Sequence, residues 1–246
     1  MEVKGFSFLS GRQKKVLKII CQSYLKGFGP VASGYLSKRF FKEASSTLRG
    51  ELLSLEKKGF LKKLHTSSGR IPTDFGLRYY LENLAKKKKC PLRIKVVIRR
   101  NIKSEEDFFR REVFEKIVAE IAENISEVVL AAFLGKKERI LIKEGMLKVL
   151  KRDEEVKDLE ELIESLRALV EKFVEIFERK EVWPRIFIGE EVPFIRSGIL
   201  GMVGGCYQDS KNKSRKILMA LVGKRKMAYL RNLAILEEIK KTISSL

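Results

Sequence analysis

Residues 44–74 read ASSTLRGELLSLEKKGFLKKLHTSSGRIPTD, and this stretch decides how the rest of the chain is interpreted. Its first half carries apolar residues at spacings of four and three, namely Leu48, Leu52 and Leu55. That spacing places them on one face of a helix. Ser45 and Ser46 are expected to cap the helix, because a hydroxyl can accept a hydrogen bond from an unpaired backbone N–H. Gly59 stands where a left-handed residue would end the helix.

The second half of the stretch predicts a hairpin. Residues 60–64 form a short apolar and basic strand, and residues 65–70 are rich in turn-forming types. Ile71 is expected to start a return strand that Pro72 cuts short. A helix followed by a basic hairpin is the pattern of a winged helix that docks on DNA.

The flanking sequence completes this pattern. Ser10 and Gln13 match a capping box at the start of a first helix, and Ser33 is expected to cap a short second helix. Residues 75–84 predict a further helix, for which Thr73 is the expected cap. Helix, helix, helix and hairpin in this order is typical of a winged-helix domain.

The charge of the chain favours a polyanionic partner. The 246 residues carry a formal net charge of +20. Residues 1–90 hold 20 basic and 6 acidic residues, hence +14, and the remainder supplies +6. A concentrated positive field attracts nucleic acid, although a solvated lysine-rich surface, as in a thermophile, is the alternative.

Several classes of protein are not expected. Three cysteines without a C-x-x-C pair predict neither a disulfide framework nor a metal site. His65 is the single histidine and has no ligand or catalytic partners at suitable spacing, so we expect no enzyme, no metal and no cofactor. The absence of a signal peptide and of a long apolar run predicts a cytoplasmic protein without a membrane segment.

The lysines of residues 86–89 and the following Pro91 indicate a linker, because like charges repel and proline disfavours helix before it. We therefore expect domains at residues 1–85 and 93–246, joined by a basic linker at residues 86–92. The alternative role for the lysines is an arm that contacts phosphates.

The second domain should mix strands and helices. Residues 93–100 predict a strand from alternating Ile94, Val96 and Ile98, and Ser104 is expected to cap a helix that ends near Glu123. The longest predicted helix, residues 156–179, carries a stripe spaced by three and four. The stripe could pack on the domain's own sheet or form a dimer seam. Further strands are expected at residues 127–133, 139–142, 185–189, 199–207 and 216–222, turns at 135–137 and 209–213, and a closing helix at 230–243.

Two long motifs resemble one family. HTSSGRIPTDFGLRYY, residues 65–80, resembles the wing of the HrcA-type heat-inducible transcription repressors, whose pattern is close to HTSAGRIPTDKGYRYY. SSTLRGELLSLEKKGFL, residues 45–61, resembles their recognition helix, with Gly50 in place of a usual asparagine. FIGEE, residues 187–191, and GKRKMAY, residues 223–229, resemble C-terminal elements of the family, and KEGML, residues 143–147, does so more loosely.

The resemblance implies an α+β protein with an N-terminal winged-helix DNA-binding domain and a trimmed GAF-like α/β domain whose dimerising insert is reduced or absent. It also implies a repressor of chaperone operons that binds an inverted-repeat operator on double-stranded DNA as a homodimer, modulated by the GroE chaperonin. The stripe from Leu159 to Ile176 and the helix at residues 75–84 are the candidate dimer surfaces. A basic RNA- or ribosome-associated module is the alternative function.

The candidate DNA-binding residues fall into three groups. Arg49 points away from the leucine face and can reach a guanine edge or a phosphate, unless it is only a solvated side chain. A helix N-terminus suits phosphate, which favours Ser45, Ser46 and Thr47 unless they serve only as caps. Phosphate contacts are also expected from Lys38 and Arg39, and wing contacts to the backbone or minor groove from His65, Thr66, Ser67 and Arg70.

Overall fold

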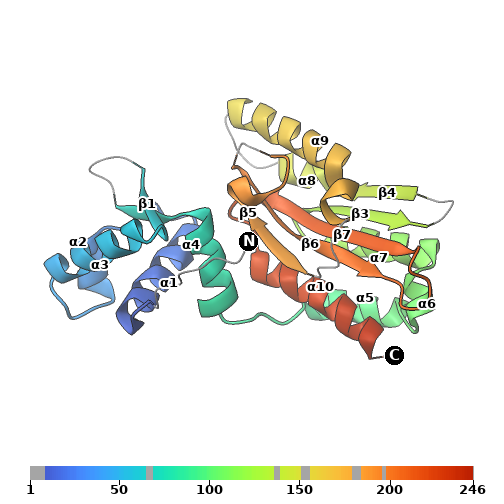
Figure 1. Ribbon diagram of the computed structural model, residues 1–246, viewed down its shortest axis with the longest axis horizontal. Coiled ribbons are helices and arrows are strands. Elements are labelled where there is room, and N and C mark those ends of the chain that lie inside the picture. The colour runs from blue at the N-terminus through green and yellow to red at the C-terminus, as the bar shows by residue number, and fades with distance from the viewer. Residues whose placement is uncertain are drawn as a thin grey trace. The chain divides into compact units, whose positions relative to one another are not determined.

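Two groups of elements, each with its own core, make up the protein (Figure 1). The computed structural model describes residues 9–64, 69–135, 139–150, 156–178, 184–195 and 198–245. The chain divides between Lys86 and Lys87 into unit 1, Met1–Lys86, and unit 2, Lys87–Leu246. The mixed α+β composition predicted from the sequence is confirmed, with helices in both units and a five-stranded sheet in unit 2.

Unit 1 contains the predicted order of helices and hairpin. Its elements are α1 (Gly11–Leu25), α2 (Ser33–Arg39), α3 (Ser45–Lys57), β1 (Leu61–Lys63), β2 (Arg70–Pro72), α4 (Asp74–Tyr79) and the π-helical turn η1 (Tyr80–Leu84). The predicted capping box starts α1: Gln13 N donates to Ser10 Oγ at 3.1 Å, and Ser10 N donates to Gln13 Oε1 at 3.3 Å. The predicted caps of α2 and α3 are wrong, because Ala32 and Ala44 occupy those positions without a side-chain bond.

The hairpin β1–β2 is antiparallel, with Leu61 opposite Pro72 and Lys63 opposite Arg70. The return strand begins at Arg70, one residue earlier than predicted, and it ends at Pro72 after three residues. The backbone of Arg70 also exchanges hydrogen bonds with Val31, at 2.8 and 2.9 Å. The tip, residues 65–68, lies outside the described residues.

The helix after the wing packs tightly on its strand. Thr73 caps α4 as predicted, accepting from Gly76 N at 3.0 Å. The backbone of Gly76 lies so close to Phe60, the residue before β1, that a Cβ atom there would meet the Phe60 carbonyl oxygen at 1.9 Å. The apolar side of α4 and η1, formed by Leu77, Tyr80 and Leu81, is buried within unit 1.

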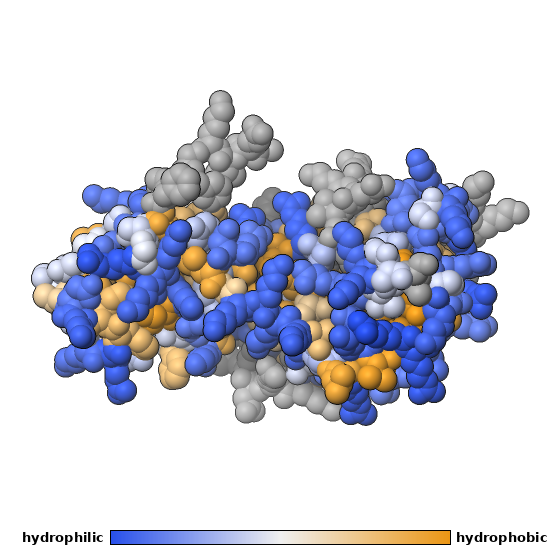
Figure 2. Space-filling view, turned by 90° about the horizontal axis from the view of Figure 1, so that it is seen from below, coloured by the Kyte–Doolittle hydropathy of each residue, from blue (hydrophilic) through white to orange (hydrophobic). Residues whose placement is uncertain are grey.

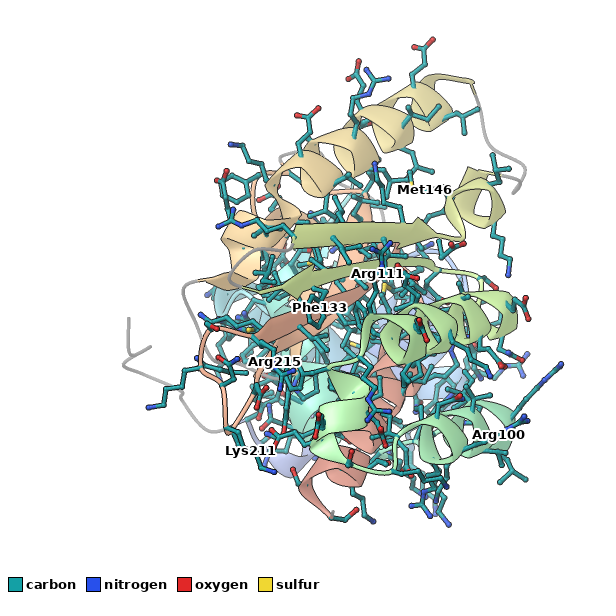
Figure 3. The ribbon with its side chains drawn as sticks, turned by 90° about the vertical axis from the view of Figure 1, so that its right-hand side faces the viewer. Arg100, Arg111, Phe133, Met146, Lys211 and Arg215 are labelled. Carbon is teal, nitrogen blue, oxygen red and sulfur yellow. The ribbon has the colours of Figure 1, made fainter. Side chains whose placement is uncertain are left out.

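Unit 2 is built on an antiparallel sheet in the order β4-β3-β7-β6-β5. The strands are β3 (Val128–Leu134), β4 (Arg139–Glu144), β5 (Arg185–Ile188), β6 (Leu200–Gln208) and β7 (Lys216–Lys224). The helices are α5 (Leu92–Asn101), α6 (Glu105–Phe108), α7 (Arg111–Asn124), α8 (Met146–Leu150), α9 (Val156–Glu178), the 3-10 turn η2 (Gly189–Glu191) and α10 (Tyr229–Ser244). Figure 3 shows the sheet between α9 on one face and α5, α7 and α10 on the other.

Two sequence predictions for unit 2 are wrong. Residues 93–100 form helix α5 and not a strand: Ile94 and Ile98, four residues apart, are buried, whereas Val96 is 55% exposed. A single helix after Ser104 was expected, but the chain breaks at residues 109–110 into α6 and α7, and Ser104 caps only α6. The predicted turn at 135–137 lies partly outside the described residues.

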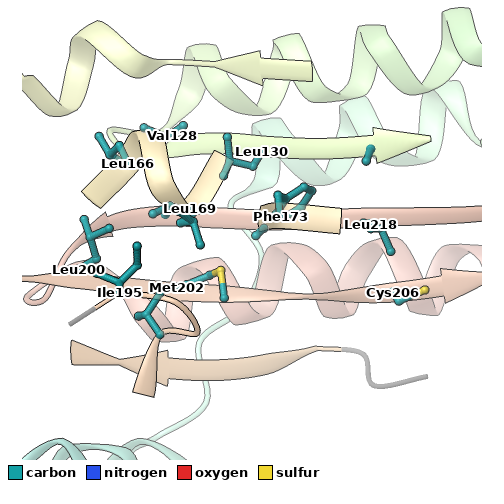
Figure 4. Close-up of a cluster of buried hydrophobic side chains, with 14 of the residues drawn as sticks. Val128, Leu130, Leu166, Leu169, Phe173, Ile195, Leu200, Met202, Cys206 and Leu218 are labelled. Carbon is teal, nitrogen blue, oxygen red and sulfur yellow. The ribbon is translucent and has the colours of Figure 1, made fainter. Parts of the chain in front are cut away.

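Helix α9 buries its apolar stripe against the sheet of its own chain (Figure 4). Four of the stripe residues are 0–2% exposed: Leu162, Leu166, Leu169 and Phe173. They contact Val128 and Leu130 of β3 and Leu200 and Met202 of β6 within one hydrophobic cluster. The dimer-seam interpretation of this stripe is therefore wrong, because its side chains are already covered.

Among the described residues, the helices are either too short or too polar to cross a lipid bilayer. The same residues contain no group of three or more histidine, cysteine or acidic side chains placed to hold a metal ion.

Candidate nucleic-acid interface

Helix α3 has one buried and one exposed face. Leu48, Leu52 and Leu55 are 0–1% exposed, as their spacing predicts. The opposite face carries a stripe of exposed residues, which we call the α3 stripe: Ser46, Arg49, Gly50, Leu53 and Lys57. Each member has another three or four residues away, so together they lie along one side of the helix. The leucines thus fix which side chains α3 presents to a partner.

Polar contacts with α1 hold α3 in place. Gln13 Nε2 donates to Ser54 Oγ at 3.1 Å, and Lys58 Nζ donates to Gln13 Oε1 at 3.0 Å. Arg12 lies 3.3 Å from the carboxylate of Glu43 and 3.5 Å from that of Glu51. Glu43 precedes α3 and Glu51 lies within it, and Arg12 partly neutralises both of them. A phosphate approaching α3 would consequently meet less repulsion than the sequence suggests.

The N-terminus of α3 is open. The side chains of Ser45, Ser46 and Thr47 are exposed, and the N-cap Ala44 supplies no side-chain hydrogen bond. The first backbone N–H groups of a helix have no partner within the helix. The hydroxyl oxygens of Ser33, at the start of α2, and Ser45, at the start of α3, lie 2.9 Å apart. The N-termini of the two helices therefore place hydroxyl and backbone N–H groups close together. Such an arrangement suits a phosphate oxygen.

Lys38 and Arg39 end α2, which packs against α3. Both side chains are exposed. Among the described residues neither has a carboxylate within ion-pair distance, and the same is true of Arg49. These three cations therefore remain available to an external anion.

Arg70, predicted to contact DNA from the wing, has a partner within unit 1. Its Nη2 and Nε atoms donate to Glu56 Oε2 at 3.0 and 3.3 Å, and its side chain is only 11% exposed. The ion pair between Arg70 and Glu56 therefore links β2 to α3. His65, Thr66 and Ser67, the other predicted wing residues, lie outside the described residues.

The sequence interpretation missed four exposed residues near this surface. Leu53, 41% exposed, and Lys57 continue the α3 stripe beyond Arg49 at steps of four. Lys62 and Lys63 of β1 are exposed at the start of the wing. Counting in steps of four from Arg49 would have identified the first two.

The part of the chain that carries this surface has a positive net charge. By sequence, residues 1–85 hold 16 basic and 6 acidic residues, a net charge of +10. Figure 2 shows hydrophilic side chains over most of the visible face, with smaller hydrophobic areas among them. A basic surface built around an exposed helix and a hairpin is typical of proteins that bind nucleic acid.

Comparison with curated proteins points to one group. The chain is 49% identical over 77 residues to the heat-inducible transcription repressor HrcA of Mycoplasma genitalium, which is 31% of this chain and 22% of that protein. It is 35% identical over 123 residues to HrcA of Bacillus pumilus, 49% of this chain and 34% of that protein. The chain thus spans about a fifth to a third of the length of these relatives. The resemblance to HrcA repressors inferred from the sequence is confirmed over that part.

Comparison with solved structures supports the fold of the chain as a whole. A crystal structure described only as that of a hypothetical protein matches with a TM-score of 0.71, covering 96% of this chain and 98% of the other. The two sequences are 18% identical, so the likeness concerns the fold alone. No protein-family model matches the chain.

Proposed function

We propose that the chain is a sequence-specific, DNA-binding transcription repressor of heat-shock operons. Unit 1 is its winged-helix DNA-binding domain, and α3 is the recognition helix. The observation that carries the proposal is the α3 stripe, an exposed row of side chains set by buried leucines beside a basic hairpin. A helix presented in this way fits the major groove of B-DNA.

The proposed contacts divide by role. Arg49 lies in the middle of the α3 stripe and has an unpaired guanidinium among the described residues, so it can donate two hydrogen bonds to a guanine edge. Lys38, Arg39 and the open N-terminus of α3 bind phosphates and set the register of the helix. Arg70 holds the wing against α3 through Glu56.

The finer parts of the proposal rest on the resemblance. The HrcA-like repressor binds an inverted-repeat operator as a homodimer in the cytoplasm, and the GroE chaperonin modulates it. Unit 2 is a trimmed GAF-like regulatory domain, a role compatible with an antiparallel sheet covered by helices on both faces. The dimer contact lies outside the α9 stripe and outside the buried side of α4 and η1, because unit cores already occupy both.

A binding experiment tests the proposal. Affinities of the full chain are measured by fluorescence anisotropy for an inverted-repeat operator duplex and for a mixed-sequence duplex of equal length. Arg49→Ala should reduce the preference for the operator by roughly 1–3 kcal/mol, whereas Lys38→Ala should weaken both duplexes about equally. Lys26→Ala, an exposed change outside α2, α3 and the wing, is the matched control.

Two outcomes contradict the proposal. An unchanged operator preference in Arg49→Ala would remove Arg49 from base recognition. Tighter binding to a structured RNA than to either duplex would favour an RNA- or ribosome-associated module instead. Sedimentation of the intact chain at micromolar concentration tests the homodimer separately, and a monomer would remove it from the proposal.

A further inference from the structure

The segment between the two unit cores carries an unusual excess of charge. No acidic residue occurs between Glu82 and Glu105, and residues 86–103 hold nine basic residues among eighteen. The net charge is +10 for residues 1–85, +9 for residues 86–103 and +1 for residues 104–246. Nearly half of the chain's +20 therefore sits in this short segment. Outside it, unit 2 is almost neutral.

The structure leaves most of these cations exposed and unpaired. Lys86, Lys87, Lys88 and Lys89 are exposed, and so are Arg93, Arg100 and Lys103 on and just after α5. Within the described part of the chain, none of these seven has a carboxylate at ion-pair distance. Lys95 and Arg99 share one acceptor, Glu238, at 3.9 and 2.8 Å. Intramolecular pairing thus accounts for little of the charge.

Helix α5 turns a row of cations outward. Ile94 and Ile98 anchor its inner side at 1% and 0% exposure. Arg93 and Arg100, seven residues apart, fall on nearly the same side of the helix, about 10 Å apart along its axis. Figure 3 shows Arg100 on the outer side of α5, at the edge of the unit. Two of the exposed charges of α5 therefore lie on one side of the helix.

The opposite face of unit 2 has the opposite sign. The outer side of α9 exposes five glutamates, Glu160, Glu161, Glu164, Glu171 and Glu175. Only Arg167 and Lys172 oppose them among the described side chains of that helix. Since α9 covers the sheet face opposite α5, unit 2 is electrically polarised across its sheet. A polyanion would attract the α5 side and repel the α9 side.

We propose that residues 86–103 form a second DNA-binding surface, the linker–α5 surface, which grips the phosphate backbone next to the duplex held by unit 1. The proposal rests on the DNA-binding function proposed above and extends it to unit 2. The segment follows η1 directly, and its six non-helical residues 86–91 can span at most about 20 Å. The surface contributes affinity and no base specificity, because phosphates are common to all sequences.

A duplex fits this surface better than an anionic membrane does. An interfacial helix must bury a large apolar face in the lipid. The apolar face of α5 is already buried in unit 2, and only Leu92 and Val96 remain as exposed apolar side chains, at 76% and 55%. The exposed groups of this surface are mainly positive charges, which complement the negative charges of a phosphate backbone.

The test compares salt dependences in the full chain. The variant Arg93→Gln/Arg100→Gln/Lys103→Gln removes three cations from the surface. The control Arg167→Gln/Lys211→Gln/Lys213→Gln removes three exposed cations elsewhere in unit 2, so the two proteins have equal net charge. Figure 3 shows Lys211 and Arg100 at different edges of the unit. Affinities for operator and mixed-sequence duplexes are measured by anisotropy between 50 and 200 mM salt.

If three phosphate contacts are lost, the slope of log affinity against log salt should flatten by about 2.7, at roughly 0.9 per contact. The wild type would then lose about 40-fold more affinity than the variant over this fourfold range of salt. Both duplexes should respond equally, and the control should keep the wild-type slope. Glutamine replacements at residues 86–89 should flatten the slope in the same way, and circular dichroism verifies that each variant is folded.

Three results would overturn the inference. If the α5 variant matches the control while Arg49→Ala still lowers operator preference, the DNA-binding function stands and the second surface does not. If the wild type binds neither duplex at 50 mM salt, both proposals fail together. If the α5 variant loses binding to phosphatidylcholine–phosphatidylserine vesicles but keeps its DNA slope, the surface binds membranes instead.

Discussion

Replacing Gly76 by alanine tests how α4 is seated on the wing. A Cβ atom built at Gly76 lies 1.9 Å from the carbonyl oxygen of Phe60, and its other close neighbours, at 2.8 and 3.0 Å, are also backbone atoms of Phe60. No side chain can rotate away to make room. The same carbonyl oxygen accepts from Thr73 N at 3.1 Å, so any shift of β1 also disturbs the cap of α4.

The magnitude follows from two opposing effects. Forcing a methyl group into a packed site costs typically 1–3 kcal/mol, and contact with rigid backbone places this site at about 3 kcal/mol. Alanine is favoured over glycine inside a helix by about 1 kcal/mol. We therefore expect Gly76→Ala to lower the free energy of unfolding of unit 1 by about 2 kcal/mol, the difference of those two effects.

Gly50→Ala is the matched control. Gly50 lies inside α3, and no atom lies within 4 Å of a Cβ built there. The same chemical change should therefore stabilise unit 1 by about 1 kcal/mol through helix propensity alone.

Hydrogen exchange in the full chain measures both effects in unit 1 separately from unit 2. Slow amides of α1 and α3 should exchange about 30-fold faster in Gly76→Ala and about 5-fold slower in Gly50→Ala, at 1.4 kcal/mol per tenfold change. Amides of the sheet in unit 2 should be unchanged. Equal protection in the wild type and Gly76→Ala would refute the argument, because it would mean that α4 and β1 separate without cost.

Three further outcomes are expected. Gly50→Ala should weaken operator binding although it stabilises unit 1, because its methyl group projects from the α3 stripe; an anisotropy titration checks this. Glu56→Gln should cost about 1 kcal/mol and speed amide exchange in β2, because Arg70 loses a carboxylate at 3.0 Å. Burial acts to raise the pKa of Glu105, but hydrogen bonds from Ser210 and Tyr207 outweigh it and lower that pKa. The contact between Glu105 and Ser210 is therefore fully stabilising above the unfolded pKa of about 4.3 and is lost as pH falls through the lower folded pKa. Hydrogen exchange of the Ser210 amide should become faster as the contact is lost. The Glu105→Gln variant should lack this acid dependence.

The elements that the sequence predicts well are those with strong local signals. The inward face of α3 follows from three leucines at spacings of three and four, and the start of α1 follows from the reciprocal pair Ser10 and Gln13. The start of α3 was harder to place. Ser45 and Ser46 are both good caps, yet the N-cap position lies earlier, at Ala44, and both serine side chains are exposed. Propensity identifies the region of a helix start but not which residue adopts the non-helical backbone.

Contacts between distant residues could not be predicted in the same way. The sequence predicts that Arg70 is a free cation at the wing. Nothing near it in the sequence indicates that its guanidinium will donate to the carboxylate of Glu56 in α3. In α5, Ile94, Val96 and Ile98 satisfy a period of two, while Ile94 and Ile98 also satisfy a helical step of four. Only packing against the rest of unit 2 decides between them, because a short apolar run fits both periods.

The packing of the apolar stripe on α9 also could not be predicted from local sequence, and it affects how two copies of the chain can associate. Spacings of three and four specify an apolar side of a helix, but a second helix and a sheet accept that side equally well. The deciding fact is that β3, β6 and β7 present an apolar face, against which Leu166 and Phe173 become fully buried. A stripe that forms the core of unit 2 cannot also join two copies of the chain. The two-fold contact of the proposed homodimer is therefore expected from residues outside the buried stripe of α9 and the buried side of α4 and η1.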